Sequence, residues 1–164
     1  MVEIELRYMK ISDAERFYEI LSNPNFSYFE VNIESVEDER EWLKEEAQRR
    51  EKSKEYNYAI LYEGELVGGC GIAVDQRQKH TAEIGYFVDE DYWNRGIATE
   101  GVKKLEKIAF DELELVRLEI RMEPENTASE RVALKCGYHK EGVIRKAYLR
   151  DDKYRDCLLY SKVR

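Results

Sequence analysis

The residues best suited to bind a charged ligand lie at positions 95–99, which read Arg-Gly-Ile-Ala-Thr. They follow a short apolar strand and an acidic turn, and an amphipathic helix is expected to begin with them. Gly96 permits a tight turn and the close approach of a ligand. The first amides of a helix lack partners within it, and Arg95 adds a bidentate donor for phosphate. The stretch therefore predicts a site for a phosphorylated ligand.

A simpler interpretation of this stretch stays open, because a single glycine at a helix start is more often only a turn. The stretch is not a P-loop, since no Gly-Lys-Ser/Thr follows it. It is not a dinucleotide fingerprint either, since G-x-G-x-x-G is missing. A second motif is needed to decide between a turn and a binding site.

That second motif is the stretch 126–138, Asn-Thr-Ala-Ser-Glu-Arg-Val-Ala-Leu-Lys-Cys-Gly-Tyr, which follows another expected strand. Asn126 or Thr127 can cap a helix, and Glu130 would complete a capping box with Thr127. Asn126 and Ser129 lie three residues apart, so both side chains can project from one end of that helix. Taken alone, the pattern is typical of any capped helix.

An acidic residue, Glu83, interrupts an otherwise apolar strand. Strand alternation places it on one face with Thr81, Gly85 and Phe87. A carboxylate in such a strand costs free energy unless it has a partner or a function. Burial would raise its pKa toward a value useful for a general base. The alternative is a structural hydrogen bond from Glu83 to a loop.

The periodicity of apolar residues predicts the elements that position these groups. Expected strands cover residues 2–9, 56–62, 66–74, 80–88, 116–122, 138–148 and 154–162, and expected helices cover about 12–24, 35–54, 96–113 and 127–136. A capping box of Ser12 and Glu15 is expected to begin the first helix. Trp42, Leu43 and Ala47 are expected to face inward from the second. The order β-α-α-β-β-β-α-β-α-β-β predicts an α/β domain on a mixed sheet.

The composition sets limits on the protein class. The chain has 164 residues, of which 43% are hydrophobic and 38% charged, which predicts one soluble domain over residues 1–164. The net charge of −8 argues against a nucleic-acid partner and suits a cationic one, such as an amine. No apolar run approaches the ~20 residues that cross a membrane, and residues 2–6 alternate like a strand rather than a signal peptide.

The three cysteines, Cys70, Cys136 and Cys157, are far apart in the chain and lack a C-x-x-C pair. This argues against a disulfide framework and against a metal site. We expect them to be free apolar side chains, as in a cytoplasmic protein.

Together the two motifs resemble those of the GNAT acetyltransferases, specifically the RimJ/RimL-like branch of ribosomal-protein-alanine and -serine N-acetyltransferases. Residues 95–100 resemble the pyrophosphate signature Q/R-x-x-G-x-G/A, with Trp93 where many members carry Gln or Arg. Residues 126–138 resemble the second family motif, and residues 141–143 and 154–156 the closing strands, although Asp152 replaces a frequent turn glycine. The resemblance spans nearly the whole chain. It implies a mixed, mostly antiparallel central sheet with helices on both faces.

The resemblance also implies acetyl-CoA as donor, a primary amine as acceptor, and direct attack of the amine on the thioester. Backbone groups around Phe87 and Val88 would then hold the pantetheine arm, with Asn126 in contact with it. The amides that would hold the pyrophosphate belong to Arg95, Gly96, Ile97, Ala98 and Thr99. Lys103, Lys104, Arg131 and Lys135 are candidates for the 3′-phosphate, the alternative for each being a solvated helix face.

Two catalytic roles follow from the resemblance. Ala133 stands where many members carry the tyrosine that protonates the leaving thiolate, so Ser129 is the candidate for that role. Glu83 lies where a carboxylate is the general base in some members. Tyr86 and Tyr148 are weaker candidates for lining the acceptor pocket.

Three functions stay open from the sequence. The first is an N-acetyltransferase of a protein or peptide α-amine. The second is an acetyltransferase of a small amine, such as a polyamine or an aminoglycoside-like compound, and the third is a non-catalytic acyl-CoA-binding module. Glu83 and Ser129 favour an enzyme. The acceptor side, formed by residues 25–35, the charged helix and the final hairpin, is the least informative part, and a homodimer is left open.

Overall fold

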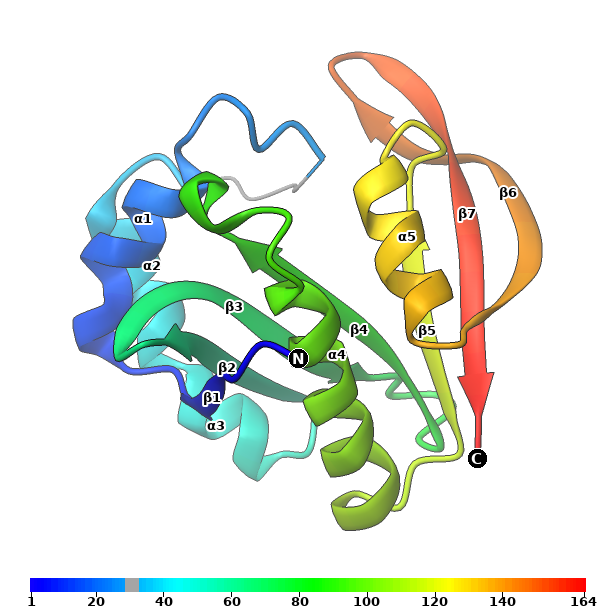
Figure 1. Ribbon diagram of the computed structural model, residues 1–164, viewed down its shortest axis with the longest axis horizontal. Helices are drawn as coiled ribbons and strands as arrows, with labels where there is room; N and C mark the ends of the chain where they lie inside the picture. Colours follow the sequence, from blue (N-terminus) through cyan, green and yellow to red (C-terminus); the bar gives the residue numbers. More distant parts are fainter. Residues whose placement is uncertain (29–32) are drawn as a thin grey trace.

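The computed structural model describes residues 1–28 and 33–164. Seven strands form one sheet in the order β1-β2-β3-β4-β5-β7-β6 (Figure 1). The strands are β1 (Glu5–Tyr8), β2 (Glu55–Tyr62), β3 (Glu65–Val74), β4 (Thr81–Val88), β5 (Arg117–Met122), β6 (His139–Arg150) and β7 (Lys153–Val163). The α-helices are α1 (Ala14–Leu21), α2 (Val36–Lys44), α3 (Glu46–Glu51), α4 (Ile97–Lys107) and α5 (Thr127–Lys135). The α/β fold predicted from the sequence is therefore confirmed.

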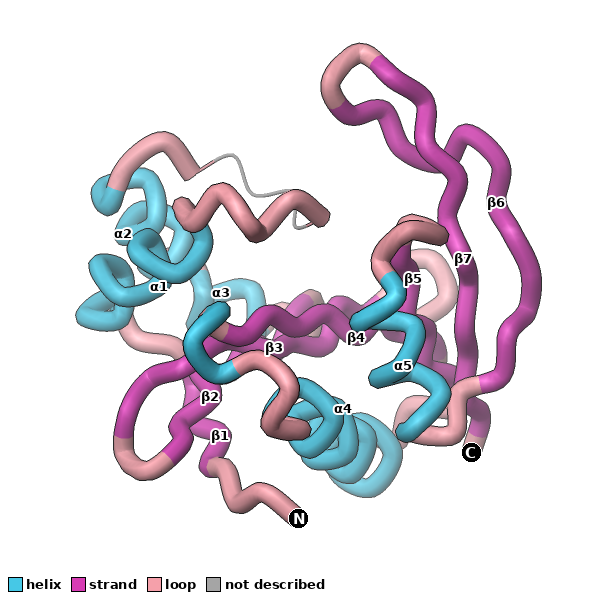
Figure 2. Tube along the Cα trace, turned by 45° about the horizontal axis from the view of Figure 1, so that its top comes forward, coloured by secondary structure: helices cyan, strands magenta, loops and turns pink. Residues whose placement is uncertain are grey.

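The sheet is antiparallel except between β4 and β5, which run parallel. Their register covers three pairs and ends at Glu83↔Glu119. Beyond that pair the described strands diverge, so that β1–β4 and β5–β7 form two halves of a split sheet (Figures 1 and 2). The divergence leaves residues 84–88 without a strand partner on the β5 side, whereas on their other side they remain paired with β3.

Helices cover both faces of the sheet, as expected (Figure 2). The larger core lies between the sheet and α4, where Ile97, Val102 and Leu105 are fully buried. A second core lies under α1 and α2 and includes Phe17 and Leu43. Alternation along the strands divides their side chains between these two cores.

The long helix predicted over residues 35–54 is broken at Glu45 into α2 and α3. Ser35 caps α2, since its hydroxyl accepts a hydrogen bond from the Asp38 amide at 3.2 Å. The inward orientation predicted for Trp42 and Ala47 is wrong: both are exposed, and only Leu43 is buried. The break turns α3 so that its Glu46, and not Ala47, faces the sheet.

The capping box predicted for Ser12 and Glu15 is also wrong. A 3₁₀ turn, Ile11–Asp13, precedes α1, and Asp13 is buried beneath it. The Asp13 carboxylate accepts a hydrogen bond from the Lys10 amide at 2.8 Å and two from the Arg7 guanidinium at 2.7 and 2.8 Å. The Asp13 carboxylate therefore caps this turn, and a charge-assisted pair with Arg7 holds the carboxylate in place.

Three further features bear on the predictions. Val116, expected within a strand, precedes β5 and is 47% exposed. Cys70, Cys136 and Cys157 are buried free thiols, as expected. Among the described residues, no helix combines the length and the apolar character needed to span a membrane, and no cluster of potential ligands could hold a metal ion.

Candidate active site

The turn between β4 and α4 has the geometry of an anion site. Gly96 is the N-cap of α4 and adopts φ +80°, a left-handed conformation that favours glycine. Its lack of a side chain leaves the amides at the start of the helix open. Ile97, the first helical residue, is 1% exposed and fixes this end of α4 in the core. The strand–turn–helix arrangement predicted from the sequence is confirmed here.

Arg95 and Trp93 stabilise the turn itself. The Arg95 guanidinium donates a hydrogen bond to the Asp91 carbonyl at 3.1 Å and lies 5.1 Å from the centre of the Tyr92 ring. The Trp93 indole N–H donates to the Val88 carbonyl at 2.6 Å. One of the backbone groups expected to contact the pantetheine arm is therefore already used to hold the turn against β4.

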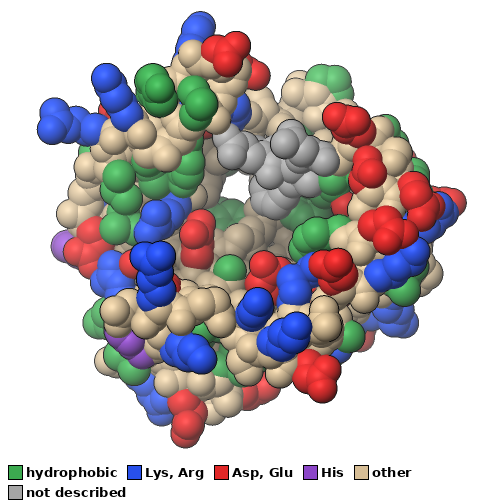
Figure 3. Space-filling view, turned by 180° about the vertical axis from the view of Figure 1, so that it is seen from behind, with side chains coloured by type: hydrophobic (Ala, Val, Ile, Leu, Met, Phe, Trp, Pro, Cys, Tyr) green, Lys and Arg blue, Asp and Glu red, His purple; other side chains and the backbone are tan. Residues whose placement is uncertain are grey.

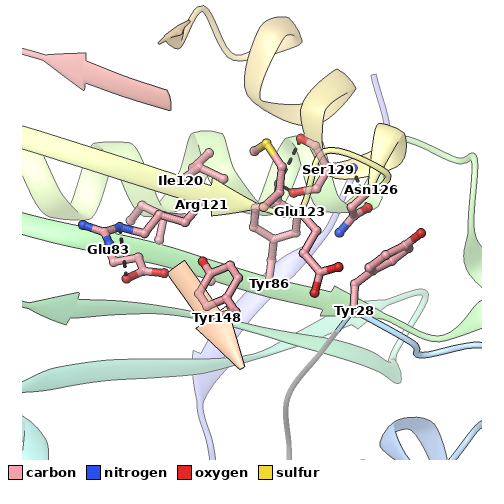
Figure 4. Close-up of a pocket in the computed structure, with 12 residues that line it drawn as sticks. Tyr28, Glu83, Tyr86, Ile120, Arg121, Glu123, Asn126, Ser129 and Tyr148 are labelled. Carbon is pink, nitrogen blue, oxygen red and sulfur yellow. Dashed lines mark hydrogen bonds and ion pairs between the residues drawn. The ribbon is translucent and has the colours of Figure 1, made fainter. Parts of the chain in front are cut away.

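A small cavity of about 250 Å³ lies where β4 and β5 diverge (Figure 4). Glu83 and Tyr86 from β4, Asn126 and Ser129 from the start of α5, and Tyr148 from β6 line it together. Residues of both halves of the split sheet therefore meet around one opening. Asn126 caps α5, since its side-chain oxygen accepts a hydrogen bond from the Ser129 amide at 3.2 Å. The reciprocal capping role predicted for Glu130 is wrong, because its carboxylate instead accepts a hydrogen bond from Tyr160 at 2.5 Å.

The hydroxyl groups of Tyr86 and Ser129 form a hydrogen-bonded pair across this cavity (Figure 4). Their oxygens are 2.7 Å apart, and the Tyr86 oxygen is also 3.3 Å from the Ser129 carbonyl oxygen. Burial raises the pKa of Tyr86 to about 12. At neutral pH Tyr86 is therefore a neutral phenol, and either hydroxyl can be the donor in the pair.

Glu83 lies at the floor of the cleft rather than inside the protein. Its side chain is 51% exposed, but neighbouring residues surround it on the concave surface. This desolvation raises the pKa of Glu83, the positive charge of Arg121 opposes the rise, and the negative charge of Glu119 adds to it. Arg121 Nε is 3.9 Å from a Glu83 oxygen, and Arg121 Nη2 is 3.0 Å from a Glu119 oxygen. The raised pKa expected for Glu83 is confirmed in direction, and its full burial is not.

A large cavity of about 550 Å³ adjoins the small one. It lies between α1, α2 and the surface of β3 and β4, and both cavities are lined by Glu83, Gly85 and Tyr86. Apolar side chains such as Phe17, Leu21 and Trp42 line it together with the carboxylates of Asp38, Glu39, Glu55 and Glu83. Viewed from behind, the molecule is hollowed at its centre, with hydrophobic and acidic side chains beside the hollow (Figure 3). The two cavities therefore adjoin at Glu83, Gly85 and Tyr86.

Comparison with known proteins agrees with this geometry. The family described as "Acetyltransferase (GNAT) domain" matches residues 3–139. The chain belongs to the GNAT acetyltransferase family. The probable N-acetyltransferase YjcK of Bacillus subtilis is 35% identical over 153 residues, which cover 87% of this chain and 84% of YjcK. The ribosomal-protein-serine acetyltransferase of Escherichia coli is 29% identical over 131 residues, covering 80% and 73% of the two chains.

A solved structure supports the same assignment. The microcin C7 self-immunity acetyltransferase MccE, in complex with acetyl-CoA and AMP, superposes with a TM-score of 0.88 at 26% identity. The match covers 98% of this chain and 92% of that one. This GNAT protein is therefore an N-acetyltransferase with acetyl-CoA as donor, and its relatives include members of the RimJ/RimL-like branch.

The residues predicted from the two motifs are brought together only in part. Glu83, Asn126 and Ser129 line one cavity. Residues 95–99, which form the turn into α4, and Phe87 do not line this cavity. The Phe87 ring instead packs against Phe17 of α1 with centroids 5.7 Å apart. The GNAT fold thus places the anion site and the small cavity at two points along the divergence of β4 from β5.

Several residues of the site could not be found from motifs. Arg150 of β6 forms an ion pair at 2.8 Å with Glu123, a buried residue that lines the small cavity. Arg150 also donates to the Ser27 carbonyl and lies 5.5 Å from the Tyr28 ring centre. It therefore ties the segment after α1 to the final hairpin, a contact between residues 123 positions apart. Tyr148, a weaker sequence candidate, does line this cavity, and its hydroxyl is 3.2 Å from Cys157 Sγ.

Proposed function

We propose that this GNAT enzyme transfers the acetyl group of acetyl-CoA to the α-amine of a protein or peptide N-terminus. The observation that carries the proposal is the environment of Glu83, the carboxylate shared by both cavities. Glu83 is half exposed, and Arg121, 3.9 Å away, opposes the rise in the Glu83 pKa that desolvation causes. Such a base suits an amine that is already easy to deprotonate.

The pKa values of the two amine classes make this distinction quantitative. A polyamine or lysine amine has a pKa near ~10.4, so its deprotonation at pH ~7.4 costs about 4 kcal/mol at roughly 1.36 kcal/mol per unit. An α-amine, with a pKa of ~7.7–8.0, requires less than ~1 kcal/mol by the same arithmetic. Only a neutral amine attacks a thioester. An α-amine therefore needs little from Glu83 beyond accepting one proton.

The anion site and the divergent strands fit the donor. The open amides at the start of α4, residues 96–99, would hold the pyrophosphate with the dipole of the helix, and Arg95 would add charge at the rim. The backbone of β4 around Phe87 and Val88 would accompany the pantetheine arm, which Asn126 would contact with its free amide nitrogen. Acetyl-CoA supplies the activated acyl group as a thioester.

Ser129 would donate a hydrogen bond to the departing sulfur. A serine hydroxyl is a weak acid, so its role is to stabilise the developing negative charge rather than to lose its proton outright. Tyr86 supports this role when its phenol is the donor of the pair, because the serine proton then points away from Tyr86. Ala133, which stands where many family members have tyrosine, is fully buried and supplies no hydroxyl.

An acceptor screen tests the proposal. Purified protein is mixed with acetyl-CoA and a set of short peptides that have free α-amines. The reaction is measured by the release of the free thiol of CoA. The same peptides with formylated N-termini are the controls, and diamines form a third group. We expect turnover with free peptides and none with formylated ones. Turnover with diamines alone would replace the proposed acceptor with a small amine.

A further inference from the structure

One buried carboxylate in the large cavity has no partner among residues 1–28 and 33–164. Glu39, in the first half of α2, is 4% exposed and lines this cavity. Within the described part of the chain, its carboxylate has no hydrogen bond and no ion pair. The other buried acids are paired: Asp13 with Arg7, Glu46 with Asn57 and Arg50, Glu106 with Lys162, and Glu123 with Arg150. Glu39 is the exception among them.

The nearby guanidinium of Arg49 does not pair with the Glu39 carboxylate. Arg49 of α3 acts on Glu39 only through its long-range charge. Its guanidinium binds Glu55 at 3.2 Å and Glu46 at 3.5 Å, and it donates to the Trp42 carbonyl at 2.9 Å. Burial accordingly raises the pKa of Glu39 to about 7, with Arg49 lowering it. An unpaired buried carboxylate is costly, and a cationic ligand would remove that cost.

The rest of the cavity selects the same kind of ligand. The other acidic residues that line the cavity are Asp38 on the same helix, Glu55 from β2 and Glu83 from β4, while α1 contributes the apolar Phe17 and Leu21. Neither lysine nor arginine is among the described residues that line it. The cavity therefore offers negative charge at its sides and apolar surface between them.

We propose that the acceptor carries a second positive charge, separated from its reacting amine by an apolar chain, and that Glu39 binds this charge. The proposal rests on the proposed function for placing the reacting amine at Glu83. Glu39 itself does not act as the base, because it lines only the large cavity, whereas Glu83 lines both cavities and shares the small one with Tyr86 and Ser129. The two carboxylates approach the ligand from different elements, α2 and β4.

Two sources could supply such a dication: a peptide with lysine as its first residue, or a free diamine. The experiment compares each with a matched monocation. The probes are lysine amide against norleucine amide, and 1,5-diaminopentane against pentylamine. Binding to the protein in the presence of CoA is measured by calorimetry at pH 8, and kcat/KM is measured with acetyl-CoA. Binding reports on Glu39 even if α-amines turn out not to be acetylated.

We expect wild-type protein to prefer each dication over its matched monocation by about tenfold or more. Glu39→Gln should reduce that preference to within about twofold and leave the monocations unchanged. Glu37→Gln removes an exposed carboxylate two residues before Glu39 on the same helix, and this variant should keep the wild-type preference. A preference for lysine amide alone identifies the peptide end as the source, and a preference for 1,5-diaminopentane alone identifies a diamine.

Two results would overturn the inference. The first is a wild-type protein that does not distinguish dications from monocations. The second is a Glu39→Gln variant that weakens both members of each pair equally, since that pattern belongs to a structural role. A thermal unfolding measurement of each variant at pH 8 confirms that the comparison is made on folded protein.

Discussion

The hydroxyl oxygen of Tyr86 lies 2.7 Å from the hydroxyl oxygen of Ser129, across the gap between the two halves of the sheet (Figure 4). Tyr86 belongs to β4, and Ser129 belongs to the first turn of α5, which follows β5. The two residues are 43 positions apart and meet only because β4 and β5 diverge after Glu83. The split of the sheet therefore allows Tyr86 to reach Ser129, the residue proposed to donate a hydrogen bond to the departing thiolate.

Removal of the Ser129 hydroxyl should slow the chemical step. We expect Ser129→Ala to lower kcat by roughly 10²-fold, the lower end of the range for a positioned proton donor, with little change in the KM for acetyl-CoA. Single-turnover kinetics, in which chemistry is rate-limiting, provides the measurement. An unchanged single-turnover rate would remove Ser129 from the mechanism.

Tyr86→Phe should have a smaller effect of the same kind. The variant keeps the ring and the Ser129 hydroxyl but loses one hydrogen bond, which corresponds to about fivefold to tenfold in kcat at about 1 kcal/mol. Tyr62→Phe is the control, because Tyr62 packs against Tyr92 with ring centroids 6.0 Å apart and does not line the small cavity. Equal losses in both variants would show that the effect is not specific to the pair.

Substitution of Gly96 should weaken CoA binding. Gly96→Asp introduces a carboxylate beside the open amides of α4, and it places a side chain on a residue with φ +80°. Gly64→Asp is the matched control, since Gly64 has φ +83° in the β2–β3 turn and open space around it. Both variants carry similar backbone strain of about 1 kcal/mol. Calorimetry with CoA should show at least roughly tenfold weaker binding for Gly96→Asp alone; wild-type affinity in this variant would mean that the anion site is misplaced.

Glu83→Gln should cost activity in a pH-dependent way. Because an α-amine deprotonates unaided as pH approaches ~7.7–8.0, the variant should lose most activity near pH 6.5 and recover substantially above pH ~8. The raised pKa of Glu83 means that the wild-type carboxylate also becomes a better proton acceptor as pH rises. A pH–rate profile of kcat/KM provides the measurement. Complete loss of activity from pH ~7 to ~9.5 would show that deprotonation is not the main task of Glu83.

Glu39 should make the folded protein less stable as pH rises. Its pKa in the folded state is about 7, above its ordinary value of 4.5, so the folded state binds more protons between these values. Stability from this group is present below pH 4.5 and is lost as pH rises through 7, a change on the order of 3 kcal/mol. Glu39→Gln should therefore raise the free energy of unfolding at pH 8 and change it little at pH 4.5. Denaturant unfolding at both pH values provides the measurement, and an equal effect at both would contradict it.

Local chemistry was predictable from the sequence. Gly96 and the Asn126–Ser129 spacing predict the starts of two helices from the local sequence, because a helix start depends on a few consecutive residues. The alternation that placed Glu83 and Phe87 on one face of β4 depends only on strand geometry. These features were confirmed as structure, although their roles in binding and catalysis remain proposals.

Relationships between distant elements could not be predicted. The residues next to Tyr86 in the sequence do not predict its hydrogen bond with Ser129 on α5. Those next to Arg150 do not predict its ion pair with Glu123. Glu39 was hidden in a helix whose many charges are typical of a solvated face. One signal was available: Glu39 lies three residues after Val36 and four before Leu43, which places it on their apolar face.

The acetylation site on a peptide with two amines tests the account most directly. A peptide that begins with lysine and ends in an amide carries one α-amine and one ε-amine on the same residue, so both can enter the large cavity. After limited turnover with acetyl-CoA, tandem mass spectrometry locates the acetyl group. The account predicts acetylation of the α-amine, with the ε-amine left free to meet Glu39. Acetylation confined to the ε-amine would contradict it.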